Sequence, residues 1–258
     1  MAAARDHADP LGALVAAIAL GVATFASPIT GGADAPPAPA PVLAAAVAPR
    51  PVVQTDVPGG DTEPGARTVA LTFDDGPDPR WTPAVVELLH RYGAVATFCM
   101  IGDTARGRED LVHSVVAAGM RLCDHTRTHD MDLVSFPRPE IVQEIAGTHD
   151  HLERVAGAPV RYFRAPGGYW SPQILDIAVE HGMQPLGWSV DSRDWQRPGV
   201  AAIVTTVQRQ MHPGAVVLMH DGGGDRSQTL RALEQLLPWL VDHGYAFVFP
   251  DGPPPPVS

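Results

Sequence analysis

Alternation of short apolar runs with amphipathic stretches is the feature that most constrains how this chain can fold. From residue 67 onward, apolar runs of strand length alternate with segments of helical periodicity, several with Pro near their start or Gly just after their end. Repeated strand–helix units predict a parallel sheet, open or closed into a barrel. The predicted strands are 68–73, 95–101, 120–123, 160–163, 184–188, 215–219 and 246–249, and the predicted helices are 82–92, 106–118, 139–155, 172–181, 200–211 and 227–242.

The N-terminal quarter differs in composition from the rest of the chain. Arg5 precedes an apolar run at 11–26, which has the length of a signal-peptide core and is marginal for crossing a bilayer. We therefore expect residues 1–35 to be an export signal. An uncleaved membrane anchor is the alternative, because acidic residues weaken the positive start of the segment. Either outcome predicts a secreted or cell-envelope protein, with membrane contact only through this N-terminal segment if it is retained uncleaved.

Segments rich in Pro flank the central part of the chain. Residues 36–66 are largely Pro, Ala, Gly and Val, and residues 251–258 contain a run of Pro. Such segments bury too little apolar area to offset the entropy lost on ordering. We therefore expect a semi-rigid linker at 36–66 and a disordered tail at 251–258. Residues 67–250 have ordinary globular composition and the length of one domain with a sizeable core.

Charge and cysteine content exclude some classes of protein. The formal net charge is −11, and no basic run or basic-aromatic stripe is present, so we expect no nucleic-acid partner. Two cysteines, Cys99 and Cys123, are too few for a disulfide scaffold. Export would permit one bridge between them. Buried free thiols are an equal alternative, because bridging neighbouring parallel strands is geometrically demanding.

Two adjacent carboxylates, Asp74 and Asp75, stand where the first predicted strand reaches a Gly-Pro turn. In α/β folds the carboxyl ends of the strands are where ligands bind. A solvated turn would also explain these acids if they stood alone, since Asp and Gly are ordinary turn residues. Their significance therefore depends on the residues at the ends of the other strands.

Two histidines, His125 and His129, come directly after the third predicted strand. A spacing of four residues predicts that both imidazoles lie on one side of a helical turn. With Asp75 at the same edge, they would supply two imidazoles and one carboxylate, a ligand set suited to catalytic zinc, which keeps a further position for water. Most isolated histidine pairs belong to surface turns, but the shared edge favours a metal site.

Three more polar clusters end successive strands. They are RAPGGY at 164–169, DSRDW at 191–195 and LMHD at 218–221. Each alone could be a solvated loop. Recurrence at one edge of successive strand–helix units instead predicts an enzyme active site.

Together the five clusters resemble the motifs of the polysaccharide deacetylases of carbohydrate esterase family four, which act on chitin and peptidoglycan. The resemblance covers residues 67–250 and includes TFDDGP at 72–77, HTRTH at 125–129, RAPGG at 164–168, DSRDW at 191–195 and LMH at 218–220. It implies a single catalytic domain with a distorted (β/α) barrel of about seven strands. It also implies removal of N-acetyl groups from an N-acetylglucosamine-containing polysaccharide. We expect the protein to be a monomer.

The resemblance further implies roles for individual residues. Asp75, His125 and His129 would bind a divalent metal, most often zinc, with cobalt or another divalent ion as a substitute. Asp74 would be the general base toward the metal-bound water, oriented by Arg164. His220 would be the general acid, with Asp191 holding its imidazolium form.

Substrate contacts are implied by the same resemblance. The backbone N–H of Gly167 would stabilise the oxyanion, and this role survives the replacement of the Tyr common at that position. Tyr169, Trp195 and Leu218 would line the sugar and acetyl sites. Two alternatives stay open: an O-deacetylase of acetylated xylan, which needs a similar tetrahedral intermediate, and a non-catalytic glycan-binding module that has kept the fold.

Overall fold

The computed structural model describes residues 51–59 and 67–253. The predicted export signal, much of the predicted linker and the end of the predicted tail lie outside these residues. Within the described ranges, no helix combines the length and the apolar character needed to cross a bilayer.

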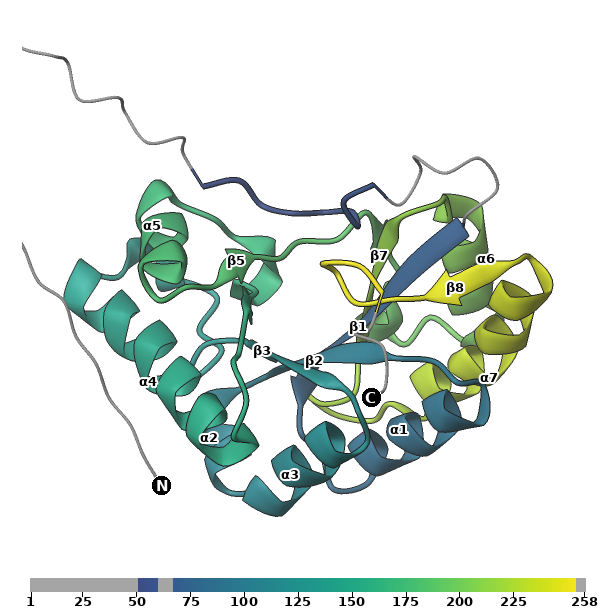
Figure 1. Cartoon of the computed structure of the whole chain (residues 1–258), viewed down its shortest axis with the longest axis horizontal. Helices are drawn as coiled ribbons and strands as arrows, with labels where there is room; N and C mark the ends of the chain where they lie inside the picture. Colours follow the sequence, from purple (N-terminus) through teal and green to yellow (C-terminus); the bar gives the residue numbers. More distant parts are fainter. Residues whose placement is uncertain (1–50, 60–66, 254–258) are drawn as a thin grey trace, which may run out of the picture. The chain divides into compact units, whose positions relative to one another are not determined.

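A curled parallel sheet forms the centre of the domain (Figure 1). The strand order is β5-β4-β3-β2-β1-β7-β6, and β8 pairs with the first residues of β1. The described strands are β1 (Arg67–Gly76), β2 (Ala96–Met100), β3 (Arg121–Asp124), β4 (Tyr162–Phe163), β5 (Gln184–Pro185), β6 (Val190–Asp191), β7 (Ala215–His220) and β8 (Tyr245–Phe247). The predicted distorted (β/α) barrel is confirmed, with β6 added to the predicted strands.

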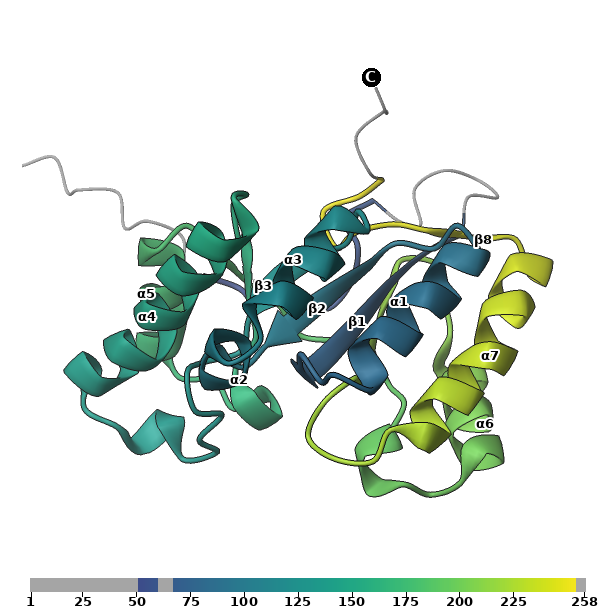
Figure 2. The same ribbon diagram turned by 90° about the horizontal axis from the view of Figure 1, so that it is seen from below.

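Helices surround the convex side of the sheet, and Figure 2 shows several of them side by side along it. They are α1 (Trp81–Arg91), α2 (Gly102–Arg106), α3 (Glu109–Ala117), α4 (Arg138–Ala156), α5 (Pro172–Glu180), α6 (Val200–Gln210) and α7 (Ser227–Asp242). Short 3₁₀ turns are η1 (Leu133–Ser135), η2 (Pro166–Gly168) and η3 (Asp194–Gln196). The helix predicted at 106–118 is present as α3, which begins three residues later, and the short helix α2 before it was not predicted.

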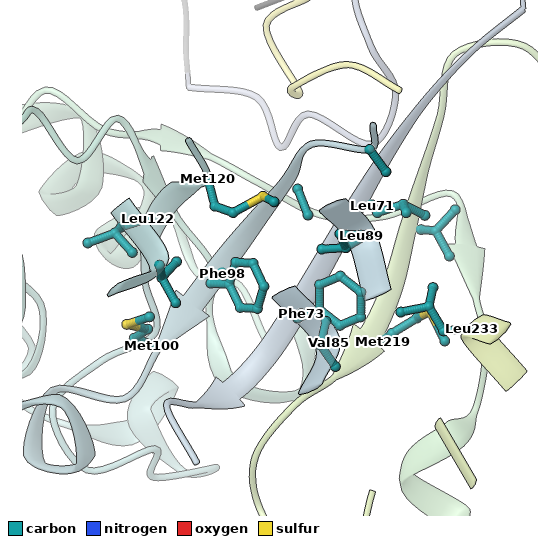
Figure 3. Packing of buried hydrophobic residues seen from close by; sticks show 14 of the residues in the cluster. Leu71, Phe73, Val85, Leu89, Phe98, Met100, Met120, Leu122, Met219 and Leu233 are labelled. Carbon is teal, nitrogen blue, oxygen red and sulfur yellow. The ribbon is translucent and has the colours of Figure 1, made fainter. Parts of the chain in front are cut away.

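The strands place alternate residues on opposite faces, as the pleat requires. Leu71 and Phe73 of β1 face the helices, where the rings of Phe73 and Phe98 stack 5.2 Å apart (Figure 3). Ala70 belongs to a smaller cluster on the inner face of the sheet. Thr72 and Asp74, in the same alternation, therefore extend from that inner face toward the carboxyl end of β1.

Residues 51–59, here called the strap, connect β5 at one end of the sheet with the start of β7. The N–H of Gln54 donates to Pro185 O (2.9 Å) in β5, and the N–H of Val57 donates to Gly214 O (2.8 Å) before β7. Val57 is buried in the inner cluster. These residues thus pack as part of the domain, and the prediction of a spacer over 36–66 is wrong for them.

The chain also remains packed just beyond residue 250. Phe249 and Gly252 exchange backbone hydrogen bonds (2.9 Å), and Asp251 forms an ion pair with Arg121. The prediction of a disordered tail over 251–258 is therefore wrong for its first two residues.

Cys99 and Cys123 form a disulfide. They are paired residues of β2 and β3, and both belong to the inner cluster. The sequence left this pairing open, and the register of the two strands decides it, because direct partners on one face bring their Cβ atoms together.

Candidate active site

A pocket of about 330 Å³ lies at the carboxyl ends of the strands. It brings together ten of the eleven site residues predicted from the sequence, all except Arg164, which is buried behind Asp74. The lining residues are Asp74, Asp75, His125, His129, Met131, Gly167, Tyr169, Trp188, Asp191, Trp195, Leu218 and His220.

Asp75, His125 and His129 converge in this pocket, with one ligand atom from each lying within 4.8 Å of the others. Asp75 Oδ1 is 3.6 Å from His125 Nε2 and 3.3 Å from His129 Nε2. That oxygen is buried and makes no hydrogen bond among the described residues. Two imidazoles and an unpartnered carboxylate oxygen aimed at one point fit a divalent metal ion.

The tautomer of His125 also fits metal binding. Its Nδ1 donates to the carbonyl of Arg164 (2.7 Å), so Nε2 is left as the free ligand atom. Burial disfavours the imidazolium of His125, but the carboxylates of Asp74 and Asp75 outweigh it and raise its pKa. For Asp75 burial likewise opposes the charge, yet the facing histidines lower its pKa, so this ligand is anionic at neutral pH.

The histidines are carried by a loop, and the predicted helical turn is wrong. Thr126 and His129 have positive φ values of 64° and 59°, which no helical turn contains. The loop is fixed by Asp124 Oδ1, which accepts from Thr126 N–H (2.8 Å), and by Thr126 Oγ1, which accepts from His129 N–H (3.1 Å). The buried carboxylate of Glu144 in α4 accepts from Thr128 N–H (2.9 Å). Side-chain hydrogen bonds, which helix periodicity does not reveal, therefore set the approach of the imidazoles.

Arg164 contacts Asp74, the residue that it was predicted to orient. Its guanidinium is fully buried, and Nη1 donates to Asp74 Oδ1 (2.6 Å) and to Thr72 Oγ1 (2.8 Å). Nε and Nη2 donate to the carbonyls of Leu186 and Gly187. With its donors directed at fixed acceptors, the arginine holds Asp74 in one orientation.

His220 is held by Asp194, so the prediction that Asp191 holds it is wrong. His220 Nδ1 donates to Asp194 Oδ1 (2.7 Å), and the His220 backbone N–H donates to Oδ2 (2.9 Å). Thr229 Oγ1 also donates to Oδ2 (2.8 Å). Asp191 ends β6 at the pocket wall, where its carboxylate accepts from Arg193 N–H (2.9 Å).

Local backbone geometry explains why Asp194 and not Asp191 contacts His220. Arg193 has a φ of 54°, and η3 begins at the next residue, so the second aspartate of DSRDW turns inward and is fully buried. Two aspartates three residues apart satisfy the same sequence pattern. The turn between them decides which one reaches the imidazole.

Known proteins resemble this chain in sequence and in fold. The sequence model of the polysaccharide deacetylases matches residues 61–186. A chitooligosaccharide deacetylase from Sinorhizobium fredii is 38% identical over 192 residues, covering 70% of this chain and 89% of that protein. A peptidoglycan-N-acetylglucosamine deacetylase from Bacillus cereus is 41% identical over 184 residues, covering 70% and 85%. This chain belongs to the polysaccharide deacetylase family.

The solved structures that match this chain include a protein described as a pseudoenzyme. A solved mutant of BA3943 from Bacillus anthracis, a pseudoenzyme of carbohydrate esterase family four (CE4) with restored enzymatic activity, matches this chain with a TM-score of 0.67 and 30% identity. The match covers 72% of this chain and 66% of that one. Catalytic roles in a polysaccharide deacetylase must therefore be judged from the residues of its own site.

In this polysaccharide deacetylase an apolar rim surrounds the polar centre. Tyr169 and Trp195 are 54% and 51% exposed at the pocket. Gly167 has a φ of 61°, and a Cβ there would lie 2.6 Å from Met131 Cε and 2.8 Å from the Tyr169 ring. The space that a larger residue would need is thus filled by Met131 and Tyr169. Met131 and Trp188 were not predicted as site residues, because apolar residues outside a motif carry no signal of their own.

Proposed function

We propose that this protein is an exported, metal-dependent hydrolase that removes N-acetyl groups from an N-acetylglucosamine-containing polysaccharide, either peptidoglycan or a chitin-like glycan. One observation carries the proposal: the Asp75–His125–His129 group shares a single pocket with an arginine-held aspartate and an aspartate-held histidine. The named activities of the relatives point to the same substrate class.

The three converging side chains would hold the metal. Their donor set suits zinc, and cobalt accepts the same ligands. When bound, such an ion lowers the pKa of a water molecule and polarises the acetyl carbonyl.

Asp74 and His220 would carry the proton transfers. They are partners in register on β1 and β7, so they reach the pocket from neighbouring strands. Asp74 takes the proton of the attacking water, and His220 delivers a proton to the leaving amine. Burial disfavours the imidazolium of His220, but Asp194 outweighs it and raises its pKa, so that His220 is protonated when the amine departs.

The remaining lining residues would position the glycan. The Gly167 N–H is offered to the oxyanion, and Leu218 closes the acetyl site. Tyr169 and Trp195 present exposed rings against which a sugar can pack.

A disulfide within the domain supports export. The Cys99–Cys123 disulfide is fully buried, and disulfides form and persist mainly in oxidising compartments. The substrates named for the relatives are peptidoglycan and chitooligosaccharides, which an exported enzyme would meet outside the cell membrane.

Substitution of the base tests the proposal. We expect Asp74→Asn to lower acetate release from an N-acetylglucosamine oligomer by roughly 10²- to 10⁴-fold, while metal content measured by atomic emission stays that of the wild type. Asp176→Asn, on α5 and away from the pocket-lining residues, is the matched control. Wild-type protein that binds the oligomer but releases no acetate would instead indicate a binding module, the alternative raised by the pseudoenzyme.

A further inference from the structure

We propose that Arg226 is a positioning residue of the metal site. It holds Asp75 Oδ2 so that Asp75 Oδ1 faces His125 and His129. The inference rests on the proposed metal-dependent function. Arg226 lies in the loop after β7, beyond the last predicted motif. It would orient Asp75 as Arg164 orients Asp74.

The two oxygens of Asp75 have different surroundings. Oδ1 faces the histidine nitrogens at 3.3 and 3.6 Å, and no hydrogen bond among the described residues occupies it. Oδ2 faces the guanidinium of Arg226, whose Nη2 is 3.8 Å away. The Arg226 side chain is only 6% exposed, so water screens this ion pair little. An opposite charge on one oxygen therefore fixes which oxygen is offered to the metal.

The loop between β7 and α7 leaves Asp75 no room to move. A Cβ at Gly222 would lie 2.0 Å from Asp75 O, and a Cβ at Gly223 would lie 2.5 Å from Asp75 Oδ2 and 3.1 Å from Arg226 Nη2. Gly223 also has a φ of 71°. Only glycine allows so close an approach of the backbone in this conformation.

Arg226 is itself hydrogen-bonded to that loop. Its Nε donates to the carbonyl of Gly222, while Nη2 faces Asp75. The planar guanidinium therefore links the loop to the carboxylate through two different nitrogens, which the single ammonium of lysine does less well. Asp75 has a φ of 72°, a conformation that costs a non-glycine residue free energy and persists only where surrounding contacts impose it.

The same turn of chain supports the acid side of the pocket. Burial opposes the charge of Asp194, but His220, Thr229 and then Arg226 lower its pKa. Thr229 lies three residues beyond Arg226, in the first turn of α7, and donates to Asp194. The start of α7 thus contacts both Asp75, a proposed metal ligand, and Asp194, which holds the proposed general acid.

Zinc affinity tests the inference. Metal-stripped wild type, Arg226→Met, Arg226→Lys and Arg231→Met would be titrated with zinc against a chromogenic chelator. Arg231 is exposed on the same helix and serves as the matched control. We expect Arg226→Met to bind zinc roughly 10- to 100-fold more weakly, Arg226→Lys to fall between it and the wild type, and Arg231→Met to match the wild type.

A spectrum separates positioning from general destabilisation. The visible absorption of the cobalt-loaded protein reports the ligand geometry, and we expect it to change in Arg226→Met and not in Arg231→Met. Wild-type zinc affinity and an unchanged cobalt spectrum in Arg226→Met would overturn the inference. Should thermal unfolding show that Arg226→Met does not fold, Arg226→Lys decides by the same two readouts. A wild type that binds no zinc would contradict the proposed function itself.

Discussion

At the scale of residues, the proposed base and the proposed acid each have a partner of opposite charge. Asp74 is bound by Arg164, and His220 is bound by Asp194. Arg164 fixes the orientation of the carboxylate that would accept a proton, and Asp194 favours the imidazolium that would give one. Two adjacent strands, β1 and β7, can therefore carry the groups for the two proton transfers of the proposed reaction.

The pH dependence of the reaction tests the Asp194–His220 pair. Because Asp194 raises the pKa of His220, activity in the wild type persists until the pH rises through that elevated value. In Asp194→Asn the pKa falls, so we expect the alkaline limb of the kcat profile to move to lower pH and kcat at neutral pH to decrease, by up to the roughly 10²- to 10⁴-fold that a general acid contributes.

Asp191→Asn is the informative comparison for this pair. Asp191 belongs to the same motif, but its carboxylate makes no hydrogen bond to His220. We therefore expect the alkaline limb of the Asp191→Asn profile to stay where it is in the wild type. A limb that moves in Asp191→Asn and not in Asp194→Asn would reverse the assignment.

At the scale of elements, the strap closes the domain between β5 and β7. Val57 is 6% exposed in the inner cluster, whereas Val52 on the same segment is 73% exposed. Val57→Ala removes two buried methyl groups, so we expect a loss of about 1–2 kcal/mol in the free energy of unfolding at about 0.8 kcal/mol per buried carbon. Urea unfolding followed by circular dichroism measures it. Val52→Ala is the control, and equal midpoints for the two variants would show that the strap does not contribute.

The disulfide between β2 and β3 is a second element-scale feature. It closes a loop that includes α2 and α3, and such a bridge stabilises mainly by restricting the unfolded chain. We expect the Cys99→Ala/Cys123→Ala double variant to lose about 2–4 kcal/mol of unfolding free energy. Thiol titration of the wild type in denaturant should find free thiols only after reduction. Two free thiols before reduction would contradict the bridge.

At the scale of the whole molecule, sequence periodicity predicted the parallel sheet because most strands are buried and most are followed by a helix. The distorted barrel was implied by the family resemblance. Periodicity missed β6, since two residues show no alternation. It also missed α2, because a helix of five residues is too short to show a helical period, and it began α3 three residues early. The strap was also missed, because its partners Leu186 and Ala215 are far away in the chain.

The site was predictable to the extent that its residues stand at strand ends. Motif spacing brought the three metal-binding candidates together with the candidate base and acid. It did not distinguish Asp194 from Asp191, since left-handed backbone at Arg193 decides between them. Arg226 lies outside the five motifs, and the sequence assigned it no role in the site. Its task is visible only in the folded structure, from its burial and from the closeness of Gly223 to Asp75.

Acetate release by the metal-stripped protein is the most direct test of metal-dependent deacetylation. The protein would be assayed on N-acetylglucosamine oligomers, peptidoglycan and acetylated xylan, first without metal and then with zinc, cobalt or manganese. We predict no release without metal, and release restored by zinc or cobalt on the N-acetylated glycans. Equal release with and without metal would contradict the proposed reaction.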